Sequence, residues 1–227
     1  GTSLESSWYR VVRRLARDCA NEIQCRYPKI LRRVGGYNLD EFVRHDRPFN
    51  LAKLLVGSEG TLGIVVEAKL NLVPLPAAKA VLVIQFADLL ESLEATPAIL
   101  RHDPSAIEVM DAFILGHTRL SPDLDRQRRT FVEGEPAALL CVEFYADRAE
   151  DLPPRLDAHE RDLAARPFRM RFHRALDPVA QQAIWQVREA ALGLAMATTG
   201  DAKAVSFVED TAVAPEKLRD YIRDFLA

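Results

Sequence analysis

The segment Gly57–Gly63 (GSEGTLG) places three glycines at a spacing of three, with one carboxylate, Glu59, between the first two. Glycine adopts positive φ and lets another backbone or a ligand come close, and three of them in so short a run oppose a helix. The spacing therefore predicts a shaped loop. The glycines alone leave two interpretations open, a ligand-holding loop and a glycine-rich turn before an edge strand.

Cysteine and histidine show no spacing typical of metal ligands. The three cysteines contain no CxxC pair, and the five histidines contain no HxH or HxxxH pair. We therefore predict no metal site in this chain and expect ordinary thiols. The residues concerned are Cys19, Cys25, Cys141, His45, His102, His117, His159 and His173.

Composition excludes several classes of protein. The 227 residues are 48% apolar, with a net charge of −3 and a pI near 6.0, which gives no footprint for nucleic acid. One local basic cluster, Arg10, Arg13, Arg14 and Arg17, is typical of a solvated helix face. Apolar runs fall short of the roughly 18 residues that span a bilayer, and the N-terminus is not signal-like. We expect a cytoplasmic protein without a membrane span.

The first third of the chain should position the glycine loop between a helix and a strand. An amphipathic pattern predicts a helix over residues 5–26, and Gly35 to Asn38 predict a turn. After the loop, residues 64–73 alternate between apolar and mostly polar side chains, which predicts a strand. Pro74 and Pro76 should end it. We place a domain boundary here, giving domains 1–76 and 77–227.

Strands and helices alternate in the second domain. The pattern predicts strands at residues 80–86, 106–110, 137–145, 168–175 and 204–208, and helices at 89–101, 154–165, 178–196 and 215–225. Such alternation allows a parallel doubly wound sheet or an α+β ferredoxin-like sheet. The absence of a GxGxxG motif after a first strand disfavours a dinucleotide-binding Rossmann domain.

Two ordered blocks of sequence resemble the FAD-linked oxidase family, and most closely its D-2-hydroxyacid dehydrogenase branch, which includes D-lactate and D-2-hydroxyglutarate dehydrogenases. The first block comprises residues 32–39 (RRVGGYNL), 49–51 (FNL) and 57–64 (GSEGTLGI); the second comprises 185–189 (WQVRE), 200–203 (GDAK) and 208–215 (VEDTAVAP). The resemblance implies an α+β fold in two parts. The end of an FAD-binding domain of the PCMH type would precede a ferredoxin-like, antiparallel substrate or cap domain, incomplete at its C-terminus.

The resemblance also implies a role for the glycine loop. In such proteins this loop runs along the FAD, so that main-chain groups would contact the cofactor. The implied cofactor-binding residues are Glu59, Gly60, Thr61, Leu62, Gly63, Ile64 and Val65. A carboxylate beside a pyrophosphate would be repelled, so Glu59 is either an acceptor for ribose or backbone donors or a clasp within the loop.

Two cations are implied as substrate-binding residues. The guanidinium fork of Arg188 would bind the carboxylate of a 2-hydroxy acid, and Lys203 would add a second positive charge. Together they would turn the C2 hydrogen towards the flavin. Without the resemblance, an ion pair of Arg188 with Glu189 or a nearby acid is the simpler interpretation.

The family's upstream glycine-rich pyrophosphate loop, its downstream histidine-rich motif and its cysteine-rich iron-sulfur region have no match in this chain. We therefore expect an internal fragment of an enzyme that oxidises a D-2-hydroxy acid, D-lactate or D-2-hydroxyglutarate, to the 2-oxo acid. We expect no catalytic residue in it, no turnover by the fragment alone and weak or no binding of FAD. The base, the metal ligands and any iron-sulfur cluster would lie outside it.

Several alternatives stay open. A different FAD-linked oxidase reaction or a non-catalytic α+β binding module would also account for part of the pattern, although the module leaves the glycine loop unexplained. The expected partner is a small 2-hydroxy acid, with no nucleic acid. The electron acceptor, a homodimer and attachment to the periphery of the inner membrane are left open.

Overall fold

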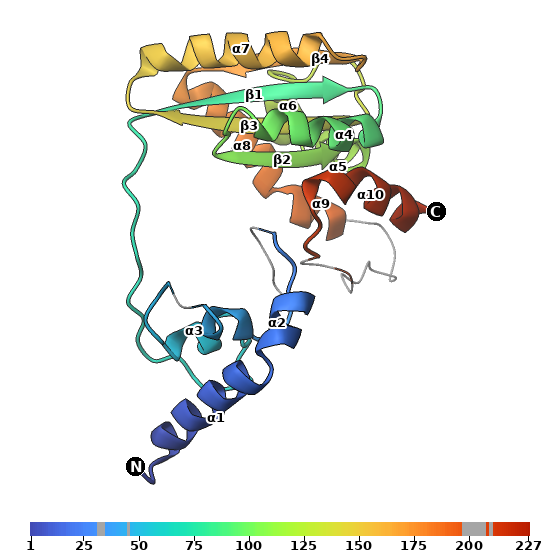
Figure 1. Ribbon diagram of the computed structural model, residues 1–227. Coiled ribbons are helices and arrows are strands. Elements are labelled where there is room, and N and C mark those ends of the chain that lie inside the picture. The colour runs from blue at the N-terminus through green and yellow to red at the C-terminus, as the bar shows by residue number, and fades with distance from the viewer. Residues whose placement is uncertain (31–34, 45, 197–207, 209–210) are drawn as a thin grey trace. The chain divides into compact units, whose positions relative to one another are not determined.

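The computed structural model describes residues 1–30, 35–44, 46–196, 208 and 211–227 (Figure 1). Its chain forms two compact units, one built mainly from Gly1–Leu72 and the other mainly from Val73–Ser206 and Ala214–Ala227. The domain limits 1–76 and 77–227 stay a prediction.

The second unit is organised by one four-stranded sheet. Its strands are β1 (Ala78–Phe86), β2 (Ala106–Asp111), β3 (Ala138–Ala146) and β4 (Met170–Ala175), in the spatial order β2-β3-β1-β4. All three pairings are antiparallel. The prediction of an α+β fold with an antiparallel sheet is therefore confirmed, and the parallel doubly wound alternative is wrong.

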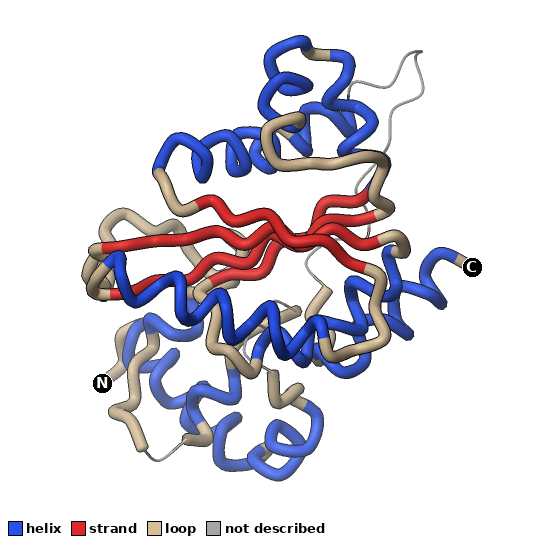
Figure 2. The backbone as a smooth tube through the Cα atoms, turned by 90° about the horizontal axis from the view of Figure 1, so that it is seen from above, coloured by secondary structure: helices blue, strands red, loops and turns tan. Residues whose placement is uncertain are grey.

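Helices cover both faces of this sheet, as Figure 2 shows. One face packs on α4 (Leu89–Leu100) and α7 (Leu152–Ala164), and the other on α5 (Ala112–His117), α6 (Pro122–Arg128) and α8 (Pro178–Glu189). Because side chains alternate along a strand, the central strand β1 sends apolar residues to both layers. Ala80, Leu82, Ile84 and Phe86 face the first layer, and Val81 and Val83 the second.

Apolar residues of the strands and helices form one core on each face of the sheet. Val81 and Val142 lie in one sheet but on opposite faces, since Val142 packs towards α4 and α7 and Val81 towards α8. Ile99 of α4 and Ile184 of α8 belong to the cores on these two faces. The sheet is therefore buried on both sides, and only its edges and ends remain for a site.

The helix predicted over residues 178–196 is two helices. Asp177 caps α8 by accepting hydrogen bonds from the amides of Val179 and Ala180, with Pro178 in the first turn. The helix ends at Glu189, and α9 (Ala191–Met196) follows. The remaining elements of this unit are η2 (Thr118–Leu120), η3 (Ala149–Asp151), η4 (Pro215–Lys217) and α10 (Leu218–Leu226).

The first unit is helical with a small core. It contains α1 (Leu4–Asp18), α2 (Ala20–Arg26), η1 (Leu39–Phe42) and α3 (Ala52–Leu55). The helix predicted over 5–26 is interrupted at Cys19, which ends α1 and precedes α2. Val12 and Ala16 of α1 pack with Phe42 and Leu54, and this cluster holds the segment that leads into the glycine loop.

The strand predicted over residues 64–73 is wrong. These residues belong to no helix or strand, and Ile64, Val66 and Leu72 are largely exposed. A strand needs a ladder partner for its amides and carbonyls, and none of the described residues pairs with this segment. The strand predicted over residues 204–208 falls almost wholly outside the described residues.

Candidate functional site

The glycine loop has the backbone shape that its sequence predicts. Gly57, Glu59 and Gly60 have positive φ, at 77°, 50° and 76°. Left-handed backbone costs an L-residue roughly 1–2 kcal/mol, so glycine is favoured at two of these positions and Glu59 is strained at the third. The chain turns sharply here and then runs on as an extended segment.

Side chains from earlier in the chain hold this loop. The Tyr37 hydroxyl lies 2.9 Å from Oγ1 of Thr61, and the Thr61 hydroxyl donates to the carbonyl of Ser58 at 2.6 Å. Nδ2 of Asn38 donates to the carbonyl of Val56 at 2.9 Å. Sequence reasoning treated Tyr37 and Asn38 as part of a turn and missed these contacts, for which the only signal was their position in the first block.

The outer side of the loop is open to a ligand. A Cβ built on Gly60 would meet no atom within 4 Å, and one built on Gly63 would meet only Leu55 Cδ2 at 4.0 Å. The Glu59 side chain is exposed and has no hydrogen bond or ion pair with any other described residue. The main chain from Glu59 to Val65 can therefore be approached without displacing part of this unit.

The second candidate site centres on Arg188, in the last turn of α8. Its Nε donates a hydrogen bond to Oε2 of Glu108 on β2 at 3.0 Å, and its Nη2 lies 3.0 Å from the same oxygen. Both side chains are partly exposed, at 44% and 39%. The ion pair is thus formed with an acid 80 residues away rather than with the neighbouring Glu189. Lys203 lies outside the described residues.

The sheet beneath this pair is polar towards one end. Glu108 is in register with Cys141, whose thiol is fully buried, and burial raises the pKa of Cys141 to about 12. Two residues along β3, the almost fully buried Glu143 accepts a hydrogen bond from Tyr145, which raises the pKa of the phenol. Lys79 stands over the Tyr145 ring at 5.3 Å from its centroid.

A cavity of about 720 Å³ adjoins these residues. Lys79 and Glu143 line it from the sheet, and Gln181, Gln182 and Trp185 line it from α8. Trp185 precedes Arg188 by three residues and therefore lies about one helical turn away on a neighbouring part of the helix surface. Sequence reasoning identified Trp185 only as part of a resemblance and missed this cavity.

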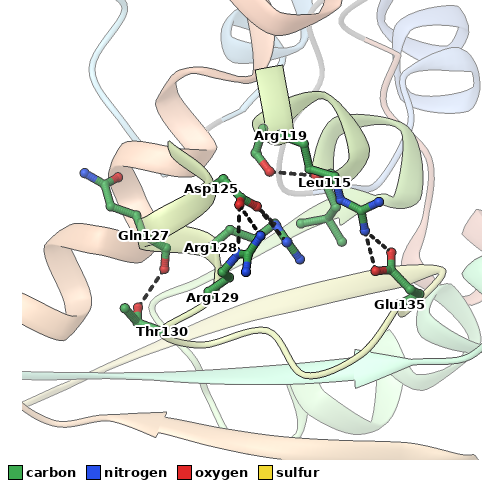
Figure 3. A network of polar contacts seen from close by, with 9 residues as sticks. Leu115, Arg119, Asp125, Gln127, Arg128, Arg129, Thr130 and Glu135 are labelled. Atoms are coloured by element: carbon green, nitrogen blue, oxygen red, sulfur yellow. Dashed lines mark hydrogen bonds and ion pairs between the residues drawn. The ribbon is translucent and has the colours of Figure 1, made fainter. Parts of the chain in front are cut away.

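A separate network of polar contacts fixes α6 and the loop that follows it (Figure 3). Arg128 and Arg129 both bond to Asp125, and their guanidinium groups hold the pKa of this carboxyl below its usual value. Arg119 pairs with Glu135 nearby. Every charged side chain in this network has a partner, so we assign the network a structural role and not a ligand-binding one.

Metal ligands do not gather anywhere in the described part of the chain: no group of three or more His, Cys, Asp or Glu side chains could hold an ion. Within the same residues no helix has the length and apolar character needed to cross a membrane.

Comparison with known proteins decides the family. The model of the C-terminal domain of FAD-linked oxidases matches residues 75–227. The chain belongs to the FAD-linked oxidase family. The resemblance predicted from the two sequence blocks is thereby confirmed. This matched region of the FAD-linked oxidase chain contains the sheet, Arg188 and the adjoining cavity, whereas the glycine loop precedes it.

Curated relatives of this FAD-linked oxidase chain are dehydrogenases. D-2-hydroxyglutarate dehydrogenase of Pseudomonas putida is 31% identical over 96% of the chain and 22% of the relative. The proteins of the same name from Pantoea ananatis and Escherichia coli are 31% and 29% identical, over 98% and 88% of the chain and 23% and 21% of those relatives. The chain thus spans about a fifth of the length of the relatives that it matches.

Proposed function

We propose that this chain is part of an FAD-dependent dehydrogenase that oxidises a D-2-hydroxy acid to the 2-oxo acid. Two findings support the proposal: the match to the C-terminal domain of FAD-linked oxidases, and the similarity to D-2-hydroxyglutarate dehydrogenases over nearly the whole chain. The observation that carries it is the position of Arg188, an exposed guanidinium at the end of α8 in the matched domain.

In this proposal the two units have different tasks. Residues 1–76 are the end of a PCMH-type FAD-binding domain, and residues 77–227 are the substrate or cap domain. The chain order β1-α4-β2-β3-α7-β4, with α5, η2 and α6 inserted between β2 and β3, and the spatial order β2-β3-β1-β4 support a ferredoxin-like arrangement of the second domain.

The glycine loop fits an extended cofactor such as FAD. Its open outer side lets amide and carbonyl groups from Glu59 to Val65 approach the cofactor. Tyr37 and Asn38 would keep the loop in this shape before the cofactor binds. The exposed Glu59 carboxylate would accept hydrogen bonds from ribose hydroxyls rather than face the pyrophosphate.

Arg188 would bind the substrate carboxylate, because a guanidinium presents two parallel donors to the two oxygens of a carboxylate. Lys203 is proposed as a second cation from the sequence alone. FAD, when bound, supplies the redox chemistry by accepting the hydride from C2 of the acid. The chain itself contributes binding and orientation, and we assign no base to it.

Substitution of Arg188 by lysine in the full-length enzyme tests this role. Lysine keeps the charge but loses the two-pronged geometry. We expect kcat/KM for D-2-hydroxyglutarate to fall at least tenfold, about 1.4 kcal/mol of transition-state binding, with unchanged FAD content. The matched control is Arg171→Lys, since Arg171 also pairs with a glutamate, Glu133, at 3.2 Å on the surface. A variant that melts earlier but keeps full activity per folded molecule would remove Arg188 from the site.

D-Lactate is a second candidate substrate. D-Lactate dehydrogenase of Anaerostipes hadrus is 33% identical to the chain, although over only 31% of it. The two acids differ by a second carboxylate, so the ratio of their kcat/KM values identifies the substrate. The fragment alone stays predicted to be inactive, and flavin absorbance in the purified fragment with turnover of either acid would contradict this.

A further inference from the structure

The contact between Arg188 and Glu108 is made along one side of the guanidinium. Nε and Nη2 both face a single carboxylate oxygen, Oε2, at 3.0 Å each. The guanidinium is planar and carries its donors in a fixed fork. A contact through Nε and Nη2 therefore leaves the end of the fork, formed by Nη1 and Nη2, pointing in a direction that Glu108 determines.

The two partners differ in how firmly the fold holds them. Glu108 belongs to β2, where it is in register with Cys141 of β3 in the middle of a pairing that runs from Ala106 to Asp111. Arg188 is the second-last residue of α8. Its guanidinium lies at the end of a long side chain with several rotatable bonds. Glu108 thus has the shorter side chain on a backbone that the strand pairing fixes, and its carboxylate restricts the orientation of the guanidinium.

The surroundings contain no group on the sheet that would replace Glu108. The neighbouring residue in register, Cys141, is fully buried and stays a neutral thiol. Glu143, two residues along β3, is almost fully buried and bonds to Tyr145. Among the described residues, Glu108 is the one acid that forms an ion pair with Arg188.

We propose that Glu108 is a positioning residue for substrate binding: it holds the side of the Arg188 guanidinium so that the end of the fork is presented to the substrate carboxylate. This inference rests on the proposed function. It differs from a gating role, in which Glu108 would compete with the substrate for Arg188, and from a structural role, in which the pair would only join α8 to β2.

Two substitutions of Glu108 in the full-length enzyme separate these roles. Glu108→Gln keeps an oxygen that can accept from Nε but removes the charge, whereas Glu108→Ala removes the acceptor. Positioning predicts that Glu108→Ala raises KM for D-2-hydroxyglutarate at least tenfold with kcat within threefold, and that Glu108→Gln raises KM less. Glu133→Ala is the matched control, because it removes a surface Glu–Arg pair on the same unit.

Every other pattern overturns the proposal. A lower KM in both variants indicates competition, and an unchanged KM with a lower melting temperature indicates a structural pair. Where Glu108→Ala does not fold, Glu108→Asp takes its place: it keeps the charge but draws the oxygen back by one methylene, and the same rise in KM is expected. An inactive wild-type enzyme would refute the proposed function instead, so the two failures are distinguishable.

Discussion

Two segments with similar sequence patterns differ in structure: one is a buried strand and the other is exposed and belongs to no helix or strand. Residues 64–73 and β1 are both rich in β-branched and other apolar side chains at strand spacing. Ile84 of β1 is fully buried between β3 and β4, while Ile64 is 92% exposed in an extended segment. Apolar side chains at strand spacing favour a β-strand, but the segment forms one only where a neighbouring strand pairs with its backbone.

The largest expected effect comes from the same substitution made in both segments. Ile84→Ala deletes buried methyl groups from the core below α4 and α7, and we expect it to lower the free energy of unfolding by about 2–5 kcal/mol. Ile64→Ala should change it by less than about 0.5 kcal/mol, since the side chain is exposed.

Urea unfolding followed by Trp185 fluorescence in a Trp8→Phe background measures Ile84→Ala, because Trp185 of α8 packs against the core of the sheet unit. Ile64 belongs to the first unit, so Ile64→Ala is followed by Trp8 of α1 in a Trp185→Phe background. A loss above about 1.5 kcal/mol for Ile64→Ala would show that the segment is buried in solution and would break the comparison.

Acid should affect the sheet unit through His159. This residue of α7 is fully buried, neither ring nitrogen has a hydrogen-bond partner among the described residues, and burial lowers the pKa of the imidazole to about 4. His102 packs against it at 4.6 Å between ring centroids and lowers its pKa further, while Asp162 and Glu160 oppose the shift. His159 is therefore neutral in the folded protein at neutral pH.

A lowered pKa in the folded state means that the unfolded chain binds more protons between pH 6.5 and 4. Stability should be fully present above pH 6.5 and fall by roughly 3 kcal/mol as pH drops to 4. Below that range the loss should continue, because hydrogen bonding to His102 lowers the pKa of Asp162 to about 2. His159→Leu should flatten the dependence above pH 4; an unchanged slope would mean that other groups cause it.

The sequence predicted the sheet unit better than the first unit, for physical reasons. Strand positions around Val81 and Val142 carry long apolar runs between turn signals, and both their faces are buried, so local pattern and tertiary environment agree. The break between α8 and α9 lies at Ala190, where no proline or glycine marks a helix end, so the sequence did not predict it. The strand prediction for residues 64–73 was wrong because alternation along the chain does not reveal whether a neighbouring strand pairs with the segment.

The candidate site was predictable in residue type but not in contacts. The sequence identified Arg188 through a resemblance, yet nothing local relates it to Glu108, 80 residues away on another element. The same holds for Tyr37 and Thr61, which meet across 24 residues. Such pairs depend on the packing of the whole unit, which periodicity along the chain does not encode.

The smallest expected effects on stability concern the glycine loop. They distinguish a glycine with positive φ, Gly60, from one without it, Gly63. Gly60 has φ of 76° and open space around a built Cβ, so Gly60→Ala should cost about 1 kcal/mol through backbone conformation alone. Gly63 has no such φ, and its Cβ would meet only Leu55 Cδ2 at ordinary contact distance. Gly63→Ala should therefore change the stability of this unit, followed by Trp8 fluorescence, by less than about 0.5 kcal/mol.

The same Gly63→Ala variant tests whether a cofactor approaches the loop. If FAD lies along the main chain from Glu59 to Val65, a methyl group at Gly63 intrudes on the cofactor although the protein itself has room for it. We expect the full-length enzyme to bind FAD at least tenfold more weakly, about 1.4 kcal/mol, with unchanged thermal stability of the apoprotein. Titration of the apoprotein with FAD gives the affinity directly. Wild-type affinity in Gly63→Ala would mean that this glycine serves neither the fold nor the cofactor, and would withdraw Gly63 from the proposed FAD contact.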